Sequence, residues 1–190
     1  HVGLAMLRGD QTPMAVQKLT ELGVDRITLL AADHCVIALR TVQEQEQRIE
    51  RLQRIAIEAA EQAERVTIPR LDGPIDATAF FASARPVVLL ERSDSRHLAT
   101  WVQTRAGDVT TLAIGPEGGW SAAEREQITA LGLDTAHLGR LILRAETCAI
   151  AALTTVLHQQ GDTDDERPPT FESEQIAQGH RDGESAQHGR

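Results

Sequence analysis

Apolar runs and turn signals alternate along residues 1–160, which is the pattern of short strands separated by helices. Residues 71–75 have the composition of a turn. The apolar runs predict strands at Val2–Leu7, Arg26–Leu30, Cys35–Leu39, Val66–Pro69, Pro86–Leu90, Val109–Ile114 and Thr135–Leu138.

Helical spacing, together with capping and stop residues, predicts helices between these strands. Ser121 and Glu124 have the spacing of a capping box. One predicted helix is long and amphipathic, with a stripe formed by Ile49, Leu52, Ile55, Ala56, Ala59 and Ala63. The expected helices are Pro13–Leu22, Gln43–Arg65, Asp76–Phe81, His97–Arg105, Ser121–Gly132 and Glu146–Gln160. Helices that alternate with strands indicate an α/β fold with a mostly parallel sheet.

Composition divides the chain into a body, residues 1–160, and a tail, residues 161–190. The tail holds 8 acidic and 3 basic residues and a single aromatic residue, Phe171. Such a segment buries too little apolar surface to offset the entropy of ordering, so we expect a disordered acidic tail. The chain as a whole has a net charge of −9, so any contact with nucleic acid must come from a local patch of arginines.

The remaining bulk features predict a cytoplasmic protein. The chain has 2 cysteines, and none of its 7 histidines has the spacing of metal ligands, so we expect neither a disulfide framework nor a metal. No apolar run approaches the roughly 20 residues of a membrane span, and no signal peptide is recognisable. The chain begins with His1 directly before a predicted strand, and we therefore expect that an N-terminal part precedes it.

The first loop with chemical potential is Gly115-Pro116-Glu117-Gly118-Gly119, between a predicted strand and a predicted helix. Glycines allow the backbone to approach a ligand closely, and ligands of open α/β sheets bind beyond the carboxyl ends of strands. The loop fits neither the Walker pattern nor the dinucleotide fingerprint. A tight strand-to-helix turn explains it equally well.

A second unusual connection runs from Leu138 to Thr147, where three apolar residues separate Arg140 from Arg144. A loop this apolar is normally buried, and its backbone groups then need partners that a ligand's polar ring edge can supply. The alternative is a short strand that runs into the last helix, with Arg144 and Glu146 paired. A third segment, Leu89-Leu90-Glu91, ends a predicted strand and is expected to form a further wall.

These two loops resemble the 16S ribosomal RNA uridine-N3 methyltransferase family of trefoil-knotted SPOUT proteins. Two further segments match this family, Gln17–Val24 and Ile55–Gln62 with Arg65. The four motifs occur in the family's order and cover residues of about 5–160. The chain departs from the family at Cys148, where alanine is usual, and at Ala63-Glu64, where a Ser/Cys-Gly pair is common.

The resemblance implies a C-terminal trefoil knot that forms a pocket for S-adenosylmethionine, a homodimer, and action on 16S rRNA within the small ribosomal subunit. It also implies a PUA-like RNA-binding barrel ahead of the knotted domain, which this sequence lacks. Mapped onto this chain, the implied cofactor-binding residues are Leu89, Leu90, Gly115, Glu117, Gly118, Gly119, Leu138, Gly139, Leu143 and Thr147.

Methyl transfer to uridine N3 needs a proton acceptor and positive groups that stabilise the uridine anion. Arg140 and Arg144 are the candidates for the cationic role. Glu117 and Glu146 are possible bases, but a loop brace and a helix cap explain them as well, so the base is not assigned.

Lys18, Glu61 and Arg65 are candidate RNA contacts, although a surface ion pair explains Lys18 and a solvated helix end explains the other two. Trp120 follows the glycine loop, where an aromatic cover is more common than base stacking. Two rival functions stay open: a non-catalytic knotted RNA-binding or ribosome-assembly module, and an α/β protein that binds another nucleotide.

Overall fold

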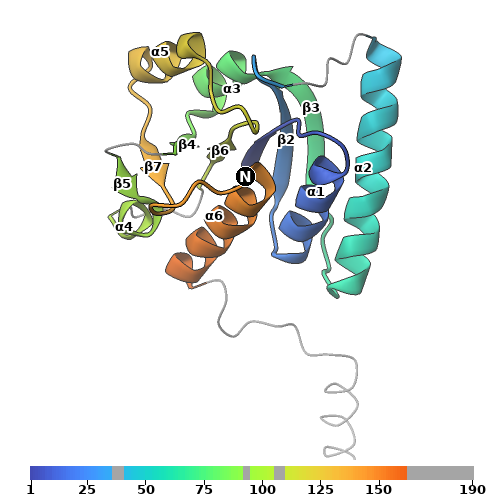
Figure 1. Ribbon diagram of the computed structural model, residues 1–190. Coiled ribbons are helices and arrows are strands. Elements are labelled where there is room, and N and C mark those ends of the chain that lie inside the picture. The colour runs from blue at the N-terminus through green and yellow to red at the C-terminus, as the bar shows by residue number, and fades with distance from the viewer. Residues whose placement is uncertain (36–40, 92–94, 105–109, 162–190) are drawn as a thin grey trace, which may run out of the picture. The chain divides into compact units, whose positions relative to one another are not determined.

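The computed structural model describes residues 1–35, 41–91, 95–104 and 110–161, and His1–Gln160 form one compact unit. Within the described residues, seven parallel strands form one sheet in the order β3-β2-β1-β6-β4-β7-β5 (Figure 1). The strands are β1 (Val2–Ala5), β2 (Arg26–Ala31), β3 (Arg70–Asp76), β4 (Val87–Leu89), β5 (Arg96–His97), β6 (Leu112–Ile114) and β7 (Thr135–His137). This confirms the predicted α/β fold with a parallel sheet, while the trefoil knot stays a prediction.

Side chains alternate between the two faces of the sheet, and each face has its own core. Leu4, Leu89 and Ile114 belong to one hydrophobic cluster. Ala5, Val88 and Ala113, their neighbours along the same strands, belong to the other cluster. This alternation is the period of two that a β-strand imposes, and both faces are apolar because helices cover both.

Four helices pack on the first face: α1 (Gln11–Glu21), α2 (Val42–Gln62), α4 (Leu98–Gln103) and α6 (Ala145–Gln160). The second face is covered by α3 (Ala77–Ala84) and α5 (Ala122–Ala130). Figure 1 shows α1 between α2 and α6, and α1 contacts both. The sheet is therefore the middle layer of three.

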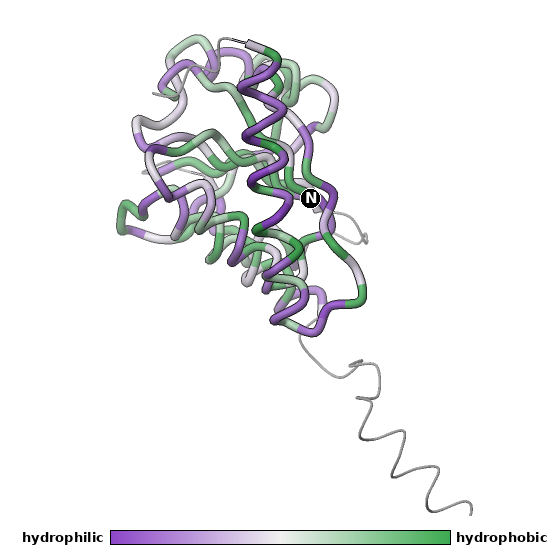
Figure 2. The backbone as a smooth tube through the Cα atoms, turned by 90° about the vertical axis from the view of Figure 1, so that its right-hand side faces the viewer, coloured by the Kyte–Doolittle hydropathy of each residue, from purple (hydrophilic) through white to green (hydrophobic). Residues whose placement is uncertain are grey.

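Helix α2 confirms the predicted amphipathic pattern. Leu52, Ala56 and Ala59 are buried, and Thr41 starts the helix with a capping box. In Figure 2, α2 faces the viewer and is coloured mostly as hydrophilic, with apolar turns between. No helix of the described residues is long and apolar enough to cross a lipid bilayer.

The prediction for residues 66–75 was wrong, because the strand covers Arg70–Asp76 and not Val66–Pro69. The side chains of Val66 and Ile68 are 85% and 50% exposed, so their apolar character does not mark a strand. Gly73 and Pro74 suggested a turn, yet β3 is an edge strand, where proline is tolerated.

Two other segments differ from the predictions or cannot be compared with them. The two-residue strand β5 was not predicted, since Arg96 and His97 carry no apolar signal. Residues 36–40, most of the predicted strand Cys35–Leu39, lie outside the described residues, as do residues 162–190 of the predicted tail.

Candidate functional site

Three connections meet at the carboxyl ends of β6, β4 and β7, which are neighbours in the sheet. Residues 115–119 follow β6, residues 90–91 follow β4, and residues 138–144 join β7 to α6. Because all three strands run in parallel, their following loops emerge at the same edge, where α/β proteins bind ligands.

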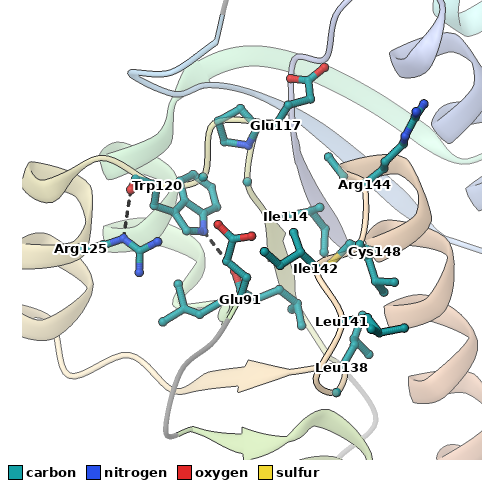
Figure 3. Close-up of a pocket in the computed structure, with 18 residues that line it drawn as sticks. Glu91, Ile114, Glu117, Trp120, Arg125, Leu138, Leu141, Ile142, Arg144 and Cys148 are labelled. Carbon is teal, nitrogen blue, oxygen red and sulfur yellow. Dashed lines mark hydrogen bonds between the residues drawn. The ribbon is translucent and has the colours of Figure 1, made fainter.

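These connections enclose a pocket of about 260 Å³ (Figure 3). Its walls combine apolar side chains, glycine backbone and a few charged groups. It is lined by Leu89, Leu90, Glu91, Ile114, Gly115, Pro116, Glu117, Gly119, Trp120, Arg125, Leu138, Gly139, Leu141, Ile142, Leu143, Arg144, Ala145 and Cys148. The loops at 115–119 and 138–144, far apart in sequence, therefore share one cavity.

Trp120 supports the glycine loop. Its indole Nε1 donates a hydrogen bond to the carbonyl oxygen of Leu89 at 3.2 Å, and its ring meets Phe81 edge-on at 5.1 Å. A Cβ atom at Gly115 would lie 3.0 Å from the indole ring, so the close approach of loop and ring favours glycine. Trp120 is 4% exposed and covers the loop.

The start of α5 fixes the far end of the glycine loop. Ser121 accepts a hydrogen bond from the backbone N–H of Glu124, and Glu124 accepts one from the N–H of Ser121 at 2.7 Å. The predicted capping box is thus confirmed. The second oxygen of the buried Glu124 carboxylate accepts the N–H of Asp33 at 3.0 Å, which joins the segment after β2 to α5.

Glu117 and Gly118 contact segments outside the pocket. The carboxylate of Glu117 accepts the backbone N–H of Arg8 at 2.9 Å and so braces the loop against the segment after β1. Gly118 does not line the pocket, and a Cβ there would lie 3.0 Å from the Cβ of His34. Glu117 therefore matches the loop-brace alternative.

The connection 138–144 is less buried than its sequence suggested. Leu141 and Ile142 are 82% and 52% exposed, and Leu138 and Leu143 are half-buried in the pocket wall. The backbone N–H of Gly139, at a φ of +127°, donates to Nδ1 of His137 at 3.0 Å. The expectation that this loop is buried was therefore wrong at Leu141 and Ile142.

The alternative for this connection, a short strand with Arg144 paired to Glu146, was also wrong. Residues 140–144 form no strand, and the described residues include no ion pair between these two side chains. Glu146 is 4% exposed, with one carboxylate oxygen that lacks a hydrogen-bond partner among the described residues. It does not line the pocket.

Eight of the ten predicted cofactor-binding residues line the pocket, and Gly118 and Thr147 do not. Of the two predicted catalytic arginines, Arg144 lines the pocket and Arg140 does not, and both are exposed. In Figure 3 the side chain of Arg144 extends away from the centre of the pocket, beyond Ile142. The assigned roles stay predictions.

None of the predicted RNA-contact residues lines the pocket. Lys18 is paired with Glu21 at 2.8 Å, as the surface-pair alternative had it. Arg65 donates to the carbonyl oxygens of Thr20 and Val24, at 2.6 and 3.1 Å, and so holds the end of α2 against the end of α1. Glu61 is exposed near the end of α2.

The residues that sequence reasoning missed include Arg125 and Cys148. Arg125 lies in the first turn of α5, and its Nε donates to the carbonyl oxygen of Trp120 at 3.0 Å, which brings the side chain back to the pocket. Its only sequence signal was its position shortly after the glycine loop. Burial, aided by the charge of Glu91, raises the pKa of Cys148 to about 12, so this thiol is protonated and uncharged in the pocket wall. The described residues contain no group of three or more potential metal ligands.

The family model described as an RNA methyltransferase domain matches residues 1–157. The chain belongs to this family. A ribosomal RNA small subunit methyltransferase E of Mesomycoplasma hyopneumoniae is 30% identical over 155 residues, which are 80% of this chain and 66% of that relative. The corresponding protein of Rickettsia conorii is 31% identical, over 82% of this chain and 62% of its own length. The chain thus spans slightly less than two thirds of these relatives.

Solved structures agree with this family membership. A methyltransferase of Legionella pneumophila, in complex with the bound cofactor SAM, superposes with a TM-score of 0.77 at 31% identity, over 83% of this chain and 65% of that one. Methyltransferase E of Neisseria gonorrhoeae, bound to S-adenosyl methionine, has a TM-score of 0.75 at 28% identity, over 86% of this chain and 67% of that one. The fold of this RNA methyltransferase domain is therefore that of proteins solved with the methyl donor.

Proposed function

We propose that this domain is the S-adenosylmethionine-binding, catalytic part of a methyltransferase that modifies N3 of a uridine in 16S ribosomal RNA. The observation that carries the proposal is the convergence of residues 115–119 and 138–144 on one pocket at the carboxyl ends of parallel strands. The name of the Mesomycoplasma relative supports the substrate class, and the SAM-bound Legionella and Neisseria structures support the cofactor.

The pocket's composition suits the cofactor. Leu89, Leu138 and Leu143 offer apolar walls to an adenine ring, and the backbone of the two loops offers donors and acceptors to the ring's polar edge. The cofactor supplies the methyl group that is transferred. The neutral thiol of Cys148 adds no charge to this wall.

The chain's own contribution to chemistry is positioning and charge. Arg144, exposed at the pocket, is proposed to hold the uridine and to stabilise the negative charge that forms when N3 loses its proton. Arg140, four residues earlier in the same connection, is proposed to contact the RNA. Glu117 already binds the N–H of Arg8 and Glu146 lies outside the pocket lining, so neither is assigned as the base.

The partners follow from the same proposal. We infer a homodimer that acts in the cytoplasm on rRNA of the small ribosomal subunit, as the family resemblance implies. Lys18, Glu61 and Arg65 are proposed to face the RNA. With a net charge of −9 on the chain, RNA contact depends on local arginines.

Calorimetry with S-adenosylmethionine is the first test, and micromolar binding that is lost in Leu143→Arg is expected. The second test is transfer of labelled methyl groups to small ribosomal subunits, by the chain and by the chain preceded by a relative's N-terminal segment. Mass spectrometry should locate the label at N3 of a uridine. Absence of cofactor binding refutes the proposal, and cofactor binding without transfer by the extended protein favours the non-catalytic RNA-binding alternative.

A further inference from the structure

Two opposite charges line the pocket close to Gly119. A Cβ atom placed on Gly119 would lie 3.3 Å from Oε1 of Glu91 and 3.7 Å from Nη2 of Arg125. Both side chains are exposed, and both belong to the pocket lining. In Figure 3 the carboxylate of Glu91 lies near the centre of the pocket and the guanidinium of Arg125 lies at its edge, both beside the indole of Trp120. A small polar group above Gly119 would be within reach of both charges.

Within the described residues, these two side chains form no ion pair with each other, although both are close to the same glycine. Arg125 is held in place through its Nε, which donates to the carbonyl oxygen of Trp120 at 3.0 Å, and its terminal nitrogens have no hydrogen-bond partner among the described residues. The negative charge of Glu91 also acts on Cys148, where it adds to burial in raising the pKa of the thiol.

The other charged groups of the lining are directed elsewhere. Glu117 accepts a hydrogen bond from the backbone of Arg8, and Arg144 extends away from the pocket centre. A carboxylate and a guanidinium that face one cavity from neighbouring positions match the ammonium and the carboxylate of an α-amino acid. S-adenosylmethionine carries such an amino-acid end on its sulfur.

We propose that Glu91 and Arg125 bind the amino-acid end of the cofactor above Gly119, with Glu91 on its ammonium and Arg125 on its carboxylate. This inference rests on the proposed function and assigns it two specificity-determining residues. Gly119 keeps the space between them open, since any side chain would enter it, and its φ of +70° also favours glycine.

The test measures the binding of four ligands to the full chain by calorimetry: S-adenosylmethionine, S-adenosylhomocysteine, decarboxylated S-adenosylmethionine and 5′-methylthioadenosine. The last ligand keeps the adenosine and the sulfur but lacks the amino-acid end. Glu91→Gln and Arg125→Gln should each lower the affinity for S-adenosylmethionine and for S-adenosylhomocysteine about 10-fold. This is the loss typical of one charge-assisted hydrogen bond in an accessible site. Both variants should bind 5′-methylthioadenosine with the same affinity as the wild type.

Decarboxylated S-adenosylmethionine separates the two roles. It lacks only the carboxylate, so Glu91→Gln should weaken its binding and Arg125→Gln should not. Glu126→Gln and Arg54→Gln are matched controls, because both residues are exposed and neither lines the pocket. Thermal melts followed by circular dichroism confirm that every variant is folded.

The outcomes distinguish this inference from the proposed function. If the wild-type chain binds none of the four ligands, the proposed function fails. The second case is that the wild-type chain binds them, but the two variants lose as much affinity for 5′-methylthioadenosine as for S-adenosylmethionine. Glu91 and Arg125 then do not bind the amino-acid end of the cofactor and only shape the pocket. If Glu91→Gln abolishes methyl transfer while cofactor affinity is unchanged, Glu91 acts as a base and the inference is overturned.

Discussion

Replacing Gly115 with alanine should test how closely the glycine loop depends on Trp120. The added Cβ would lie 3.0, 3.2 and 3.3 Å from three atoms of the indole ring, where ordinary contacts begin at 3.4 Å. The ring must therefore move by a few tenths of an ångström. It has little room, because Phe81 packs against it and its Nε1 already donates to Leu89 at 3.2 Å.

Overpacking of a rigid site costs about 1–3 kcal/mol, and a shift of a few tenths of an ångström belongs near the lower end. We expect Gly115→Ala to lower the free energy of unfolding by about 1.5 kcal/mol, measured by urea denaturation with circular dichroism. The cofactor affinity should fall as well, because Gly115 and Leu89 both line the pocket.

A double-mutant cycle with Trp120→Phe identifies the cause. The smaller ring relieves the contact, so Gly115→Ala should cost less than about 0.5 kcal/mol in that background, a coupling of about 1 kcal/mol. An equal cost in both backgrounds would refute the reasoning, since it would show that the alanine acts through the loop backbone and not through the indole.

Three further perturbations probe other parts of the fold and site. Ser121→Ala removes the cap of α5 and should cost about 1 kcal/mol of stability in urea denaturation, and an unchanged midpoint would contradict the capping role. Arg65→Ala should cost about 1–2 kcal/mol by the same measurement, because two carbonyl oxygens lose their donor, and should leave S-adenosylmethionine affinity unchanged. Equal stability of this variant and the wild type would make RNA contact the better explanation of Arg65. The pKa of Cys148 is raised from 9.0 to about 12, so the unfolded chain loses this proton first and stability falls as pH rises through that interval. Between pH 8 and pH 10, the free energy of unfolding of Cys148→Ala should therefore decline by about 1 kcal/mol less than that of the wild type. Parallel pH profiles of the two proteins would contradict a buried neutral thiol.

The parallel α/β architecture was predictable from sequence because strands β2, β4 and β6 each carry an apolar run between helices. Val87, Val88 and Leu89 are all buried, as a strand covered on both faces must be. The stripe of α2 and the capping box at Ser121 are local patterns, and local patterns are readable without tertiary structure.

Sequence reasoning failed where tertiary position decides. Val66 and Ile68 are apolar yet exposed, and the adjacent edge strand β3 contains a proline that a central strand would exclude. Leu141 and Ile142 were expected to be buried but are exposed at the pocket.

The glycine loop of the candidate site could be predicted from the sequence, whereas the contribution of Arg125 could not. A glycine loop after a strand has a local signature, and most of the residues singled out on that basis line the pocket. Arg125 lines the pocket with its Nε bound to the carbonyl oxygen of Trp120, a tertiary contact that the sequence pattern did not predict.

A crystal structure of the chain with S-adenosylmethionine tests the central claim most directly, namely that residues 115–119 and 138–144 form one adenosine-binding pocket. We predict that the adenine lies between these two stretches, with the amino-acid end above Gly119. Density for the cofactor at any other place on the molecule would contradict it.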